Sequence, residues 1–554
     1  MPSGYHAPVS PRSRKVLAAV VALALLARVA GLEFGLPLAE ARPDEQTLAY
    51  QAMKFGRGDL NPHSFNYPSL FKYVVFVLFG ADFALGRLLG RFEGQEDFLR
   101  AFFAADPEFR LLMRSFSVAA GTAGVLLLGW MPGRVWSALV LAGCFLHVRD
   151  SHFGVTDITM VTLTTGAVLA ASRLQARGTL RAAAVAGLVA GLATSTKYNA
   201  ALLIVPLVLA AATSPAASQL RIGAAAVAAM GLGFVAGSPY AVLDASTFLT
   251  DFRYEAGHLA EGHHVDVGGG WFHHATVTLP LAFGWPGFVA GAVGMLTAFG
   301  ANRRLALVVF SFPLVYFLLI GRGETAFFRY MLPVVPFVAM GAGLVLDAVH
   351  RRFGVLAAAG LAAVLLISPL WRSVQAVGLM RAGDTRSAMG AWIEGNVPTD
   401  AVIVHAGAYT GAPMLQRNVP NQTREYAARS GRADAGGFRK PDEQKWYRAA
   451  RPMYDVQFLA KAGIDYASQV TVAELLASPP PWLEVESSGL RFYSAVPAEL
   501  EPLLASRYEL AHEEVGAADP EGPVYDQQDA LYLPAARFSG VTRMGPNLRL
   551  YRLR

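Results

Sequence analysis

Residues 16–32 read VLAAVVALALLARVAGL, an apolar run that only Arg28 interrupts and that follows Arg12, Arg14 and Lys15. About 20 apolar residues are enough for a helix to cross a bilayer. The run is too long for the apolar part of a signal peptide and no small-residue cleavage site follows it, so we predict a retained membrane anchor. Because basic residues stay on the cytoplasmic side, the N-terminus is predicted to lie inside.

The whole chain has the composition of a multi-span membrane protein. Of its 554 residues, 54% are hydrophobic and 16% are charged, whereas soluble domains carry about a quarter charged residues. Arginines in cytoplasmic loops explain the formal net charge of +6. No basic stripe with interleaved aromatic residues is present, so we expect no nucleic-acid partner. The single cysteine, Cys144, excludes an intramolecular disulfide.

Further apolar segments predict the other spans, and they end near residue 372. The segments lie near 16–33, 70–90, 111–130, 134–149, 155–172, 182–196, 200–213, 221–240, 275–298, 305–320, 328–347 and 354–371. When the basic clusters between them are placed in the cytoplasm, only 70–90 breaks the alternation of sides. We therefore predict that 70–90 makes no net crossing, because it lies at the interface or returns through a partner near 98–105. This leaves about eleven net crossings and an outside C-terminus.

From about residue 380 the pattern becomes that of a soluble α/β domain. Asp384 is typical of a helix N-cap, and the helix after it would turn Met389, Trp392 and Ile393 inward. Strands are predicted at 401–404, near 464–466, at 508–515 and at 548–553, with a helix at 458–462. We predict a membrane domain over 1–372 and an extracytoplasmic α/β domain over 373–554, which is large enough for its own core.

Five polar clusters map to the predicted outer side of the membrane. They are Asp44-Glu45 with Asn66-Tyr67-Pro68-Ser69, then Arg149–Asp157, Thr194–Asn199, the loop Ser238–His274, and Gly321–Pro333. Charged groups are costly near lipid and are functional candidates there. The convergence of all five clusters on one face is more specific than any one of them.

Five short motifs in these clusters carry a family resemblance. They are Arg42-Pro43-Asp44-Glu45, Asn66-Tyr67-Pro68-Ser69-Leu70, Arg149-Asp150-Ser151-His152 with Asp157, Thr196-Lys197-Tyr198-Asn199, and Phe328-Arg329-Tyr330-Met331-Leu332-Pro333. In this order they resemble glycosyltransferase family 39 and its bacterial relatives, which are similar to protein O-mannosyltransferases and to the aminoarabinose transferase that modifies lipid A. The resemblance covers roughly 1–372. It implies a GT-C fold, a polyprenyl-phosphate-linked sugar as donor, and transfer on the outer face of the membrane.

The implied reaction suggests roles for the residues of these motifs. The leaving group is a lipid phosphate whose charge needs stabilisation, and the acceptor hydroxyl needs a base. We expect Asp44 to be the base, with Glu45 orienting the acceptor or substituting for Asp44. Lys197 and Arg329 would bind the donor phosphate. The other residues expected to shape the donor and substrate site are Tyr67, Asp150, His152, Asp157, Tyr198 and Tyr330.

Several of these residues also have a purely structural interpretation. Asp157 could be an N-cap-like residue of a helix, and His152 could be a satisfied histidine at the interface. Lys197 could reach only for the lipid headgroups, and Arg329 could pair with Glu324. The sequence leaves both interpretations open for each residue.

The loop 238–274 raises the question of a metal. His258, His263 and His264, together with Asp266, supply ligand types that suit a divalent cation. Their spacing matches no tight metal motif, which favours contact of some of these histidines with the donor phosphate, or no function beyond the loop, over a metal. A divalent metal is therefore the only cofactor that the sequence suggests.

The predicted function is an integral-membrane glycosyltransferase of the bacterial cytoplasmic membrane. It would be an inverting hexosyl- or pentosyltransferase embedded in the lipid bilayer. It would take the sugar from a polyprenyl-phosphate donor and transfer it, on the outer face of the membrane, to a lipid, glycan or protein acceptor. The alternative is a membrane transporter or lipid flippase, which would show internal repeats and helices broken near the midplane. The polar break at 194–199 favours transport, but no repeat at half length is present.

Overall fold

The computed structural model describes most of the chain as two compact units. The described residues are 11–104, 107–131, 134–263, 265–421, 423, 451–460, 469–494 and 496–554, without the side chains of 11, 12 and 258–260. The first unit comprises Met1–Leu32, Arg57–Val75 and Met113–Val374, and the second comprises Glu33–Gly56, Phe76–Leu112 and Gln375–Arg554. The boundary predicted near 372 lies next to the last of these divisions. However, two stretches that the sequence placed in the membrane domain, 33–56 and 76–112, group with the C-terminal residues.

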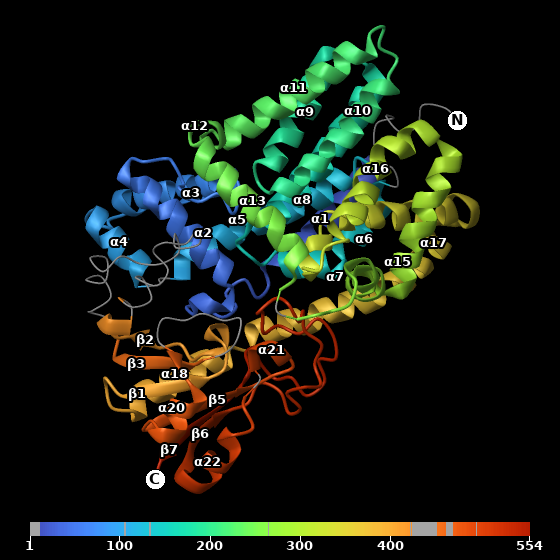
Figure 1. Cartoon of the computed structure of the whole chain (residues 1–554). Coiled ribbons are helices and arrows are strands. Elements are labelled where there is room, and N and C mark those ends of the chain that lie inside the picture. The colour runs from blue at the N-terminus through green and yellow to red at the C-terminus, as the bar shows by residue number, and fades with distance from the viewer. Residues whose placement is uncertain are drawn as a thin grey trace. The chain divides into compact units, whose positions relative to one another are not determined.

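Helices make up the first unit, and three of them (Leu70–Leu88, Pro107–Leu128 and Val335–Arg381) are divided between the two units (Figure 1). In chain order they are α1 (Pro11–Val29), α3 (Leu70–Leu88), α5 (Pro107–Leu128), α6 (Arg134–Ala142), α7 (Phe145–Asp150), α8 (Thr156–Arg177), α9 (Leu180–Thr194), η4 (Tyr198–Leu203), α10 (Ile204–Ala212), α11 (Gln219–Gly237), α12 (Tyr240–Leu243), α13 (Ala245–Glu261), α14 (Gly270–His273), η5 (His274–Thr278), α15 (Leu279–Ala301), α16 (Arg303–Ile320), η6 (Phe328–Met331) and α17 (Val335–Arg381). All the apolar segments predicted from the sequence are thus largely helical, although 134–149 forms two helices instead of one.

Five helices in the described residues are long and apolar enough to cross a membrane, judged by length and composition. They are Pro107–Leu128, Gln219–Gly237, Gly270–Ala301, Arg303–Ile320 and Val335–Arg381. The last has 47 residues, which as one helix would span about 70 Å against a hydrocarbon core of about 30 Å. It is interrupted at Gly354, where φ is 87°, so it supplies two helices, as the segments 328–347 and 354–371 predict. The number of crossings and the sides of the loops stay predictions.

The segment 70–90 forms α3, which carries Lys72, Asp82 and Arg87 and is not among those five helices. The expected partner near 98–105 is α4 (Gln95–Phe103), a helix of nine residues that is only about 14 Å long. It is therefore too short to return through the bilayer. Within the second unit, the ring of Phe79 packs edge-on against that of Phe102, with centroids 6.0 Å apart. A return through α4 is thus wrong, whereas the interfacial position of 70–90 stays a prediction.

Small residues bring α9 and α11 into close contact. A Cβ added at Gly187 would overlap the carbonyl oxygen of Ala226, and one added at Gly191 would overlap that of Met230. In lipid, helices associate through such close packing because burial of apolar surface gives no net gain there. The contact fixes the end of α9 and, with it, the polar segment 194–199. That segment leads through η4 into a separate helix, α10.

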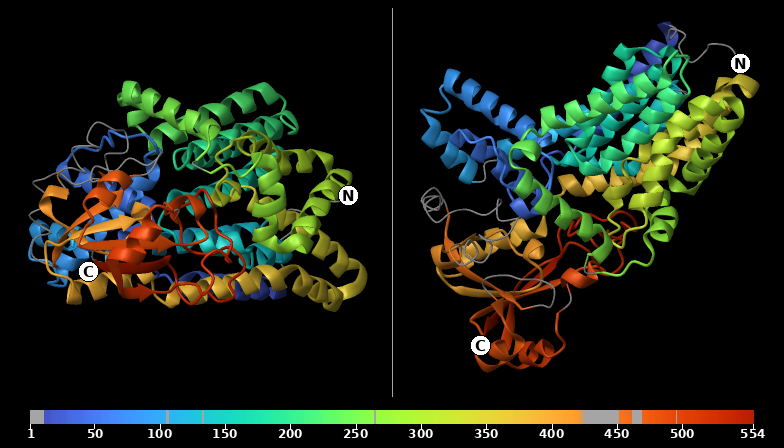
Figure 2. Two further views of the ribbon diagram at one scale, coloured as in Figure 1. Left: turned by 60° about the horizontal axis from the view of Figure 1, so that its bottom comes forward. Right: turned by 45° about the horizontal axis from the view of Figure 1, so that its top comes forward.

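The second unit contains a seven-stranded sheet in the order β2-β3-β1-β5-β7-β6, with β4 paired to β3 (Figure 2). The strands are β1 (Val402–Ala406), β2 (Gln416–Arg417), β3 (Met453–Leu459), β4 (Gln469–Val470), β5 (Trp482–Ser487), β6 (Tyr508–Glu514) and β7 (Asn547–Leu553). β1 is parallel to β3 and β5, whereas β7 is antiparallel to β5 and β6. The short helices of this unit are η2 (Ala39–Ala41), α2 (Pro43–Lys54), η3 (Phe55–Arg57), α4, α18 (Thr385–Asn396), η7 (Tyr409–Gly411), α20 (Val472–Ala477), α21 (Arg491–Ser494) and α22 (Leu500–Arg507).

Helices cover both faces of this sheet. Successive side chains of β1 point to opposite faces, so its residues pack against different helices on the two faces. Ile403 packs in one cluster with Met389 of α18, and Val404 packs in the other with Leu475 of α20 and Leu503 of α22. Each face therefore has its own apolar core, as in other α/β domains.

The structure confirms most of the predicted C-terminal elements. The side chain of Asp384 caps α18 by accepting a hydrogen bond from the backbone N–H of Arg386, and the strands predicted at 401–404, 508–515 and 548–553 are β1, β6 and β7. The helix predicted at 458–462 is wrong, because Phe458 and Leu459 end strand β3, where they pair with β4. The strand predicted near 464–466 lies outside the described residues.

Candidate functional site

The acidic pair predicted to act on the acceptor lies in the first turn of α2, directly after Pro43. The amide groups and dipole of a helix N-terminus stabilise negative charge there. The side chain of Asp44 is 30% exposed, whereas Glu45 is fully buried. Of the two carboxylates, that of Asp44 is therefore the more exposed, and the roles of both residues stay predictions.

Three predicted residues from separate parts of the chain come together in the first unit. The Nζ of Lys197 lies 2.6 Å from Oδ1 of Asp157, with the two side chains 14% and 4% exposed. The same Nζ lies 5.5 Å from the ring centroid of Tyr330, a distance at which a cation is attracted to an aromatic face. A partly buried lysine whose ammonium is paired with a carboxylate differs from a lysine that reaches only for the lipid headgroups. Asp157 lies in the first turn of α8, but the N-cap of this helix is Val155 and no side chain caps it, so the N-cap interpretation of Asp157 is wrong.

Arg329 stands next to Tyr330 in the short helix η6. Its guanidinium lies over the ring of Phe327, with Cζ 4.6 Å from the centroid, and both Arg329 and Tyr330 are half-buried. A guanidinium held against an aromatic face keeps its N–H groups in a fixed plane, which suits recognition of a phosphate.

The motif around His152 is bound tightly to its surroundings. Arg149 and Asp150 pair at 2.8 Å and both side chains are 2% exposed. Nδ1 of His152 lies 2.9 Å from the carbonyl oxygen of Val148 and its Nε2 lies 3.0 Å from that of Ala30. Because both ring nitrogens face backbone carbonyls, the geometry favours the structural interpretation of His152. Asp150 is likewise engaged by its neighbour, so these two residues shape the first unit.

Arg28 is a buried residue whose structural role was not predicted from the sequence. Its guanidinium contacts Ser151 Oγ at 3.2 Å and His147 Nδ1 at 2.8 Å. It also lies 3.5 Å from the carbonyl oxygens of Leu141 and Ala142, at the end of α6 where the helix dipole is negative. The charge therefore holds the polar motif at 147–152 against α1. Such a role could have been predicted, since a single charge in an apolar span is a functional or structural anchor by default.

Tyr198 holds the loop that contains Tyr67. The hydroxyl of Tyr198 donates a hydrogen bond to the carbonyl oxygen of Phe65 at 2.7 Å, and the N–H of Phe65 donates to Asp251 at 2.7 Å. Tyr67 itself is half-buried two residues further on. The contacts of Tyr198 are thus with protein groups, whereas the predicted role of Tyr67 in binding stays a prediction.

No group of three or more His, Cys, Asp or Glu side chains that could hold a metal is found among the residues that the structure describes. The ring of His263 packs against that of Phe327, with centroids 5.0 Å apart. His264 and the side chain of His258 lie outside the described residues. The suggested metal site at these three histidines stays a prediction.

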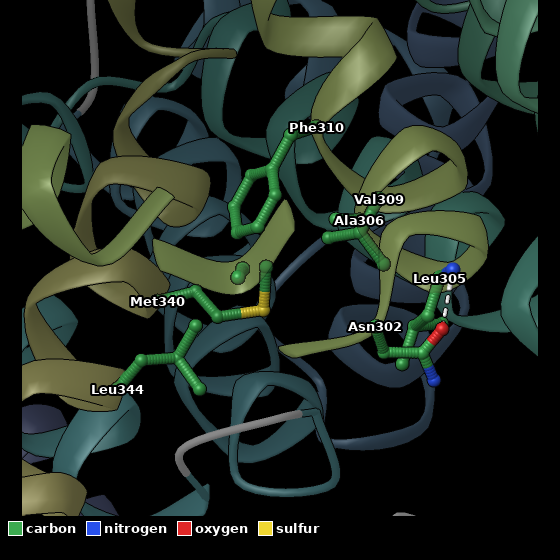
Figure 3. A pocket seen from close by; sticks show the side chains of 8 residues that line it. Asn302, Leu305, Ala306, Val309, Phe310, Met340 and Leu344 are labelled. Atoms are coloured by element: carbon green, nitrogen blue, oxygen red, sulfur yellow. Dashed lines mark hydrogen bonds between the residues drawn. The ribbon is translucent and has the colours of Figure 1, made fainter. Parts of the chain in front are cut away.

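Two recesses in the first unit are lined almost wholly by apolar side chains. One of about 20 Å³ lies between α15, α16 and α17 (Figure 3); its polar residue, Asn302, accepts a hydrogen bond from the N–H of Leu305 at 3.2 Å and so caps α16. The other, of about 410 Å³, is lined by Trp136, Leu139 and residues of 359–370. Neither recess contains a predicted site residue, so neither is a candidate donor site.

Comparison with known proteins supports the resemblance seen in the motifs. Residues 113–242 match the family model described as dolichyl-phosphate-mannose-protein mannosyltransferase, and this segment contains both members of the Asp157–Lys197 pair. The crystal structure of ArnT from Cupriavidus metallidurans bound to undecaprenyl phosphate aligns over 92% of this chain and 97% of that chain, with a TM-score of 0.52 and 14% sequence identity. The chain has the GT-C fold of ArnT.

The apo structure of the same ArnT gives a similar result, covering 90% of this chain and 96% of that chain with a TM-score of 0.51 and 13% identity. A search of curated proteins finds no significant sequence match. The predicted resemblance to membrane glycosyltransferases of the GT-C type is thus confirmed by the segment match and by the fold. Asp44 and Glu45 belong to the second unit, and the predicted phosphate-binding residues belong to the first. That the two groups form one site stays a prediction.

Proposed function

We propose that the chain is an integral-membrane glycosyltransferase that moves a sugar from a polyprenyl-phosphate donor to an acceptor on the outer face of the cytoplasmic membrane. The observation that carries the proposal is the ion pair between Asp157 and Lys197, which lies inside the segment matched to the mannosyltransferase family. The donor class is supported by the ArnT of the same fold, which was crystallised with undecaprenyl phosphate. A lipid, a glycan or a protein would each supply a suitable acceptor hydroxyl.

In the proposed reaction Asp44 removes the proton of the acceptor hydroxyl. The acceptor oxygen then attacks the anomeric carbon of the sugar from the side opposite the phosphate. The bond between that carbon and the phosphate oxygen breaks, polyprenyl phosphate leaves with the bonding electrons, and a single displacement inverts the anomeric configuration.

Lys197 and Arg329 would stabilise the negative charge that develops on the departing phosphate. Asp157 holds the ammonium of Lys197 in place before the donor binds, since the two are only 2.6 Å apart. Such preorganisation avoids reorienting a flexible side chain during the reaction. Glu45, which is fully buried, would support the turn that carries Asp44.

The test is a transfer assay with the full chain in membrane vesicles and labelled polyprenyl-phosphate sugars. Labelled product should form with the wild type, and Asp44→Asn should lower the rate by about 10²- to 10⁴-fold, the range for loss of a general base. Glu33→Gln is the matched control, because Glu33 is an exposed acid on the same stretch of chain and its loss should leave transfer unchanged. Full activity of Asp44→Asn would refute its role as the base.

Failure of every polyprenyl-phosphate sugar to give product would refute the proposed donor class. Movement of labelled lipid between the leaflets without product would instead favour the transporter.

A further inference from the structure

The chain segment that carries Asp44 is joined to the C-terminal domain by a buried ion pair. Nη1 of Arg42 lies 2.9 Å from each carboxylate oxygen of Asp529, which is 487 positions away in the sequence. The two side chains are 2% and 11% exposed. The other terminal nitrogen of the same guanidinium, Nη2, lies 3.5 Å from Oδ2 of Asp44. Arg42 therefore stands between a carboxylate of the C-terminal domain and the proposed catalytic base.

A second connection is made two residues earlier, at Glu40. The hydroxyl of Tyr409 donates a hydrogen bond to Oε1 of Glu40 at 2.6 Å. Arg386 of α18 donates to the backbone oxygen of Glu40 at 3.3 Å and to that of Thr410 at 2.6 Å. Arg386 is fully buried and is itself held by Asp384, with contacts of 2.8 Å and 2.6 Å. The segment directly before α2 is thus held by contacts to both the side chain and the backbone of Glu40.

Glu486 of β5 contacts the loop that carries Tyr409. Its Oε2 accepts a hydrogen bond from the N–H of Ala408 at 3.1 Å, and its Oε1 accepts one from the hydroxyl of Tyr532 at 2.5 Å. A Cβ at Gly411 would overlap the same carboxylate, so the loop lies directly on it. Contacts therefore run without interruption from the centre of the sheet to Glu40.

We infer that the C-terminal domain is a positioning element for the proposed catalytic base: Asp529, acting through Arg42, sets the first turn of α2 and thereby the direction of the Asp44 carboxylate. Asp529 and Arg42 are positioning residues, because they touch the acid and not the reacting atoms. The inference rests on the proposed function. The position of Asp44 would matter for the rate because a displacement of about 1 Å in a reacting group can lower the rate on the order of 10²-fold.

The experiment compares Asp529→Asn, Asp529→Glu and the wild type in the full chain in vesicles. Removing the charge of Asp529 should lower kcat by about tenfold or more while KM for the donor changes by less than about twofold, since the donor phosphate is bound elsewhere. Asp529→Glu restores the charge and should recover part of kcat. Glu394→Gln is the control: Glu394 forms an ion pair of the same unit at 2.9 Å with Arg451, and its loss should leave kcat unchanged.

A second measurement does not depend on activity. Hydrogen exchange of the amides of α2 should become faster in Asp529→Asn and stay unchanged in Glu394→Gln, while exchange in β5 stays unchanged in both. Equal α2 exchange in Asp529→Asn and wild type would overturn the inference, even if the wild type transfers no sugar and the proposed function fails. If the wild type transfers sugar, an unchanged kcat, or an effect on KM alone, in Asp529→Asn would also overturn it.

Discussion

Replacing His405 by glutamine removes a positive charge from the interior of the C-terminal sheet. Nδ1 of His405 lies 2.6 Å from Oε2 of Glu484, its Nε2 lies 3.4 Å from Oε2 of Glu486, and all three side chains are fully buried. Burial by itself lowers the pKa of His405, but the two carboxylates outweigh it and raise the pKa from 6.5 to about 9. The imidazolium is therefore charged at neutral pH and offsets two acids that have no access to water.

The size of the effect follows from this rise in pKa. At about 1.4 kcal/mol per tenfold change in proton affinity, the rise corresponds to roughly 3 kcal/mol of stabilisation. Because the pKa in the folded state is the higher one, the stabilisation is fully present below pH 6.5 and is lost as the pH rises through about 9. The pKa of Glu484 is also raised, by its burial against the opposing effect of His405, so its ionisation likewise makes the domain less stable as pH rises.

The assay is hydrogen exchange of the β1 and β5 amides in the full chain, corrected for the intrinsic effect of pH on exchange. The wild-type opening free energy should fall by roughly 2.5 kcal/mol between pH 6.5 and pH 9. His405→Gln should start about 3 kcal/mol lower, because the buried acids lose their cation, and the fall that comes from deprotonation of the imidazolium should be absent from its profile. His512→Gln, at a partly exposed position of β6, should behave as the wild type. A flat wild-type profile, or equal opening free energies of His405→Gln and wild type at pH 6.5, would contradict this prediction.

Two further predictions concern the first unit. Lys197→Met removes the cation from Asp157 and should lower sugar transfer by about 10²- to 10³-fold, as loss of a charge-stabilising group does; transfer at the wild-type rate would contradict its role at the phosphate. Gly191→Leu should destabilise the protein by up to about 3 kcal/mol, because its side chain would overlap the backbone of Met230. Thermal unfolding in detergent measures this, with Gly231→Leu as the control, since no atom lies within 4 Å of a Cβ there.

The sequence predicted most helices of the membrane part because each lies within an apolar run, although 134–149 forms two short helices. The same logic failed at 458–462, where a short apolar run has no period that separates helix from strand. Phe458 lies in a strand because its backbone pairs with β1 and β4, and such partners are not visible in a local pattern. The cap at Asp384 was predictable because its chemistry is local.

The candidate site was predicted unevenly for a similar reason. Lys197 and Asp157 could be expected to share a site because both occur in motifs of one family, and they do form an ion pair. The difference between an accessible Asp44 and a buried Glu45 was not predictable, because it depends on how α2 packs. Nothing near Arg42 in the chain indicates its partner Asp529, since no local pattern links residues so far apart.

That separation has a consequence for the biogenesis of the protein. Arg42 leaves the ribosome long before Asp529, which follows it by 487 positions, and at about 5 to 20 residues per second this stretch takes roughly 25 to 100 s to synthesise. During this time the early helices can enter the lipid, but Arg42, directly before α2, lacks its buried partner Asp529. A nascent or truncated chain would therefore insert without an ordered Asp44, and only a completed polypeptide would gain one.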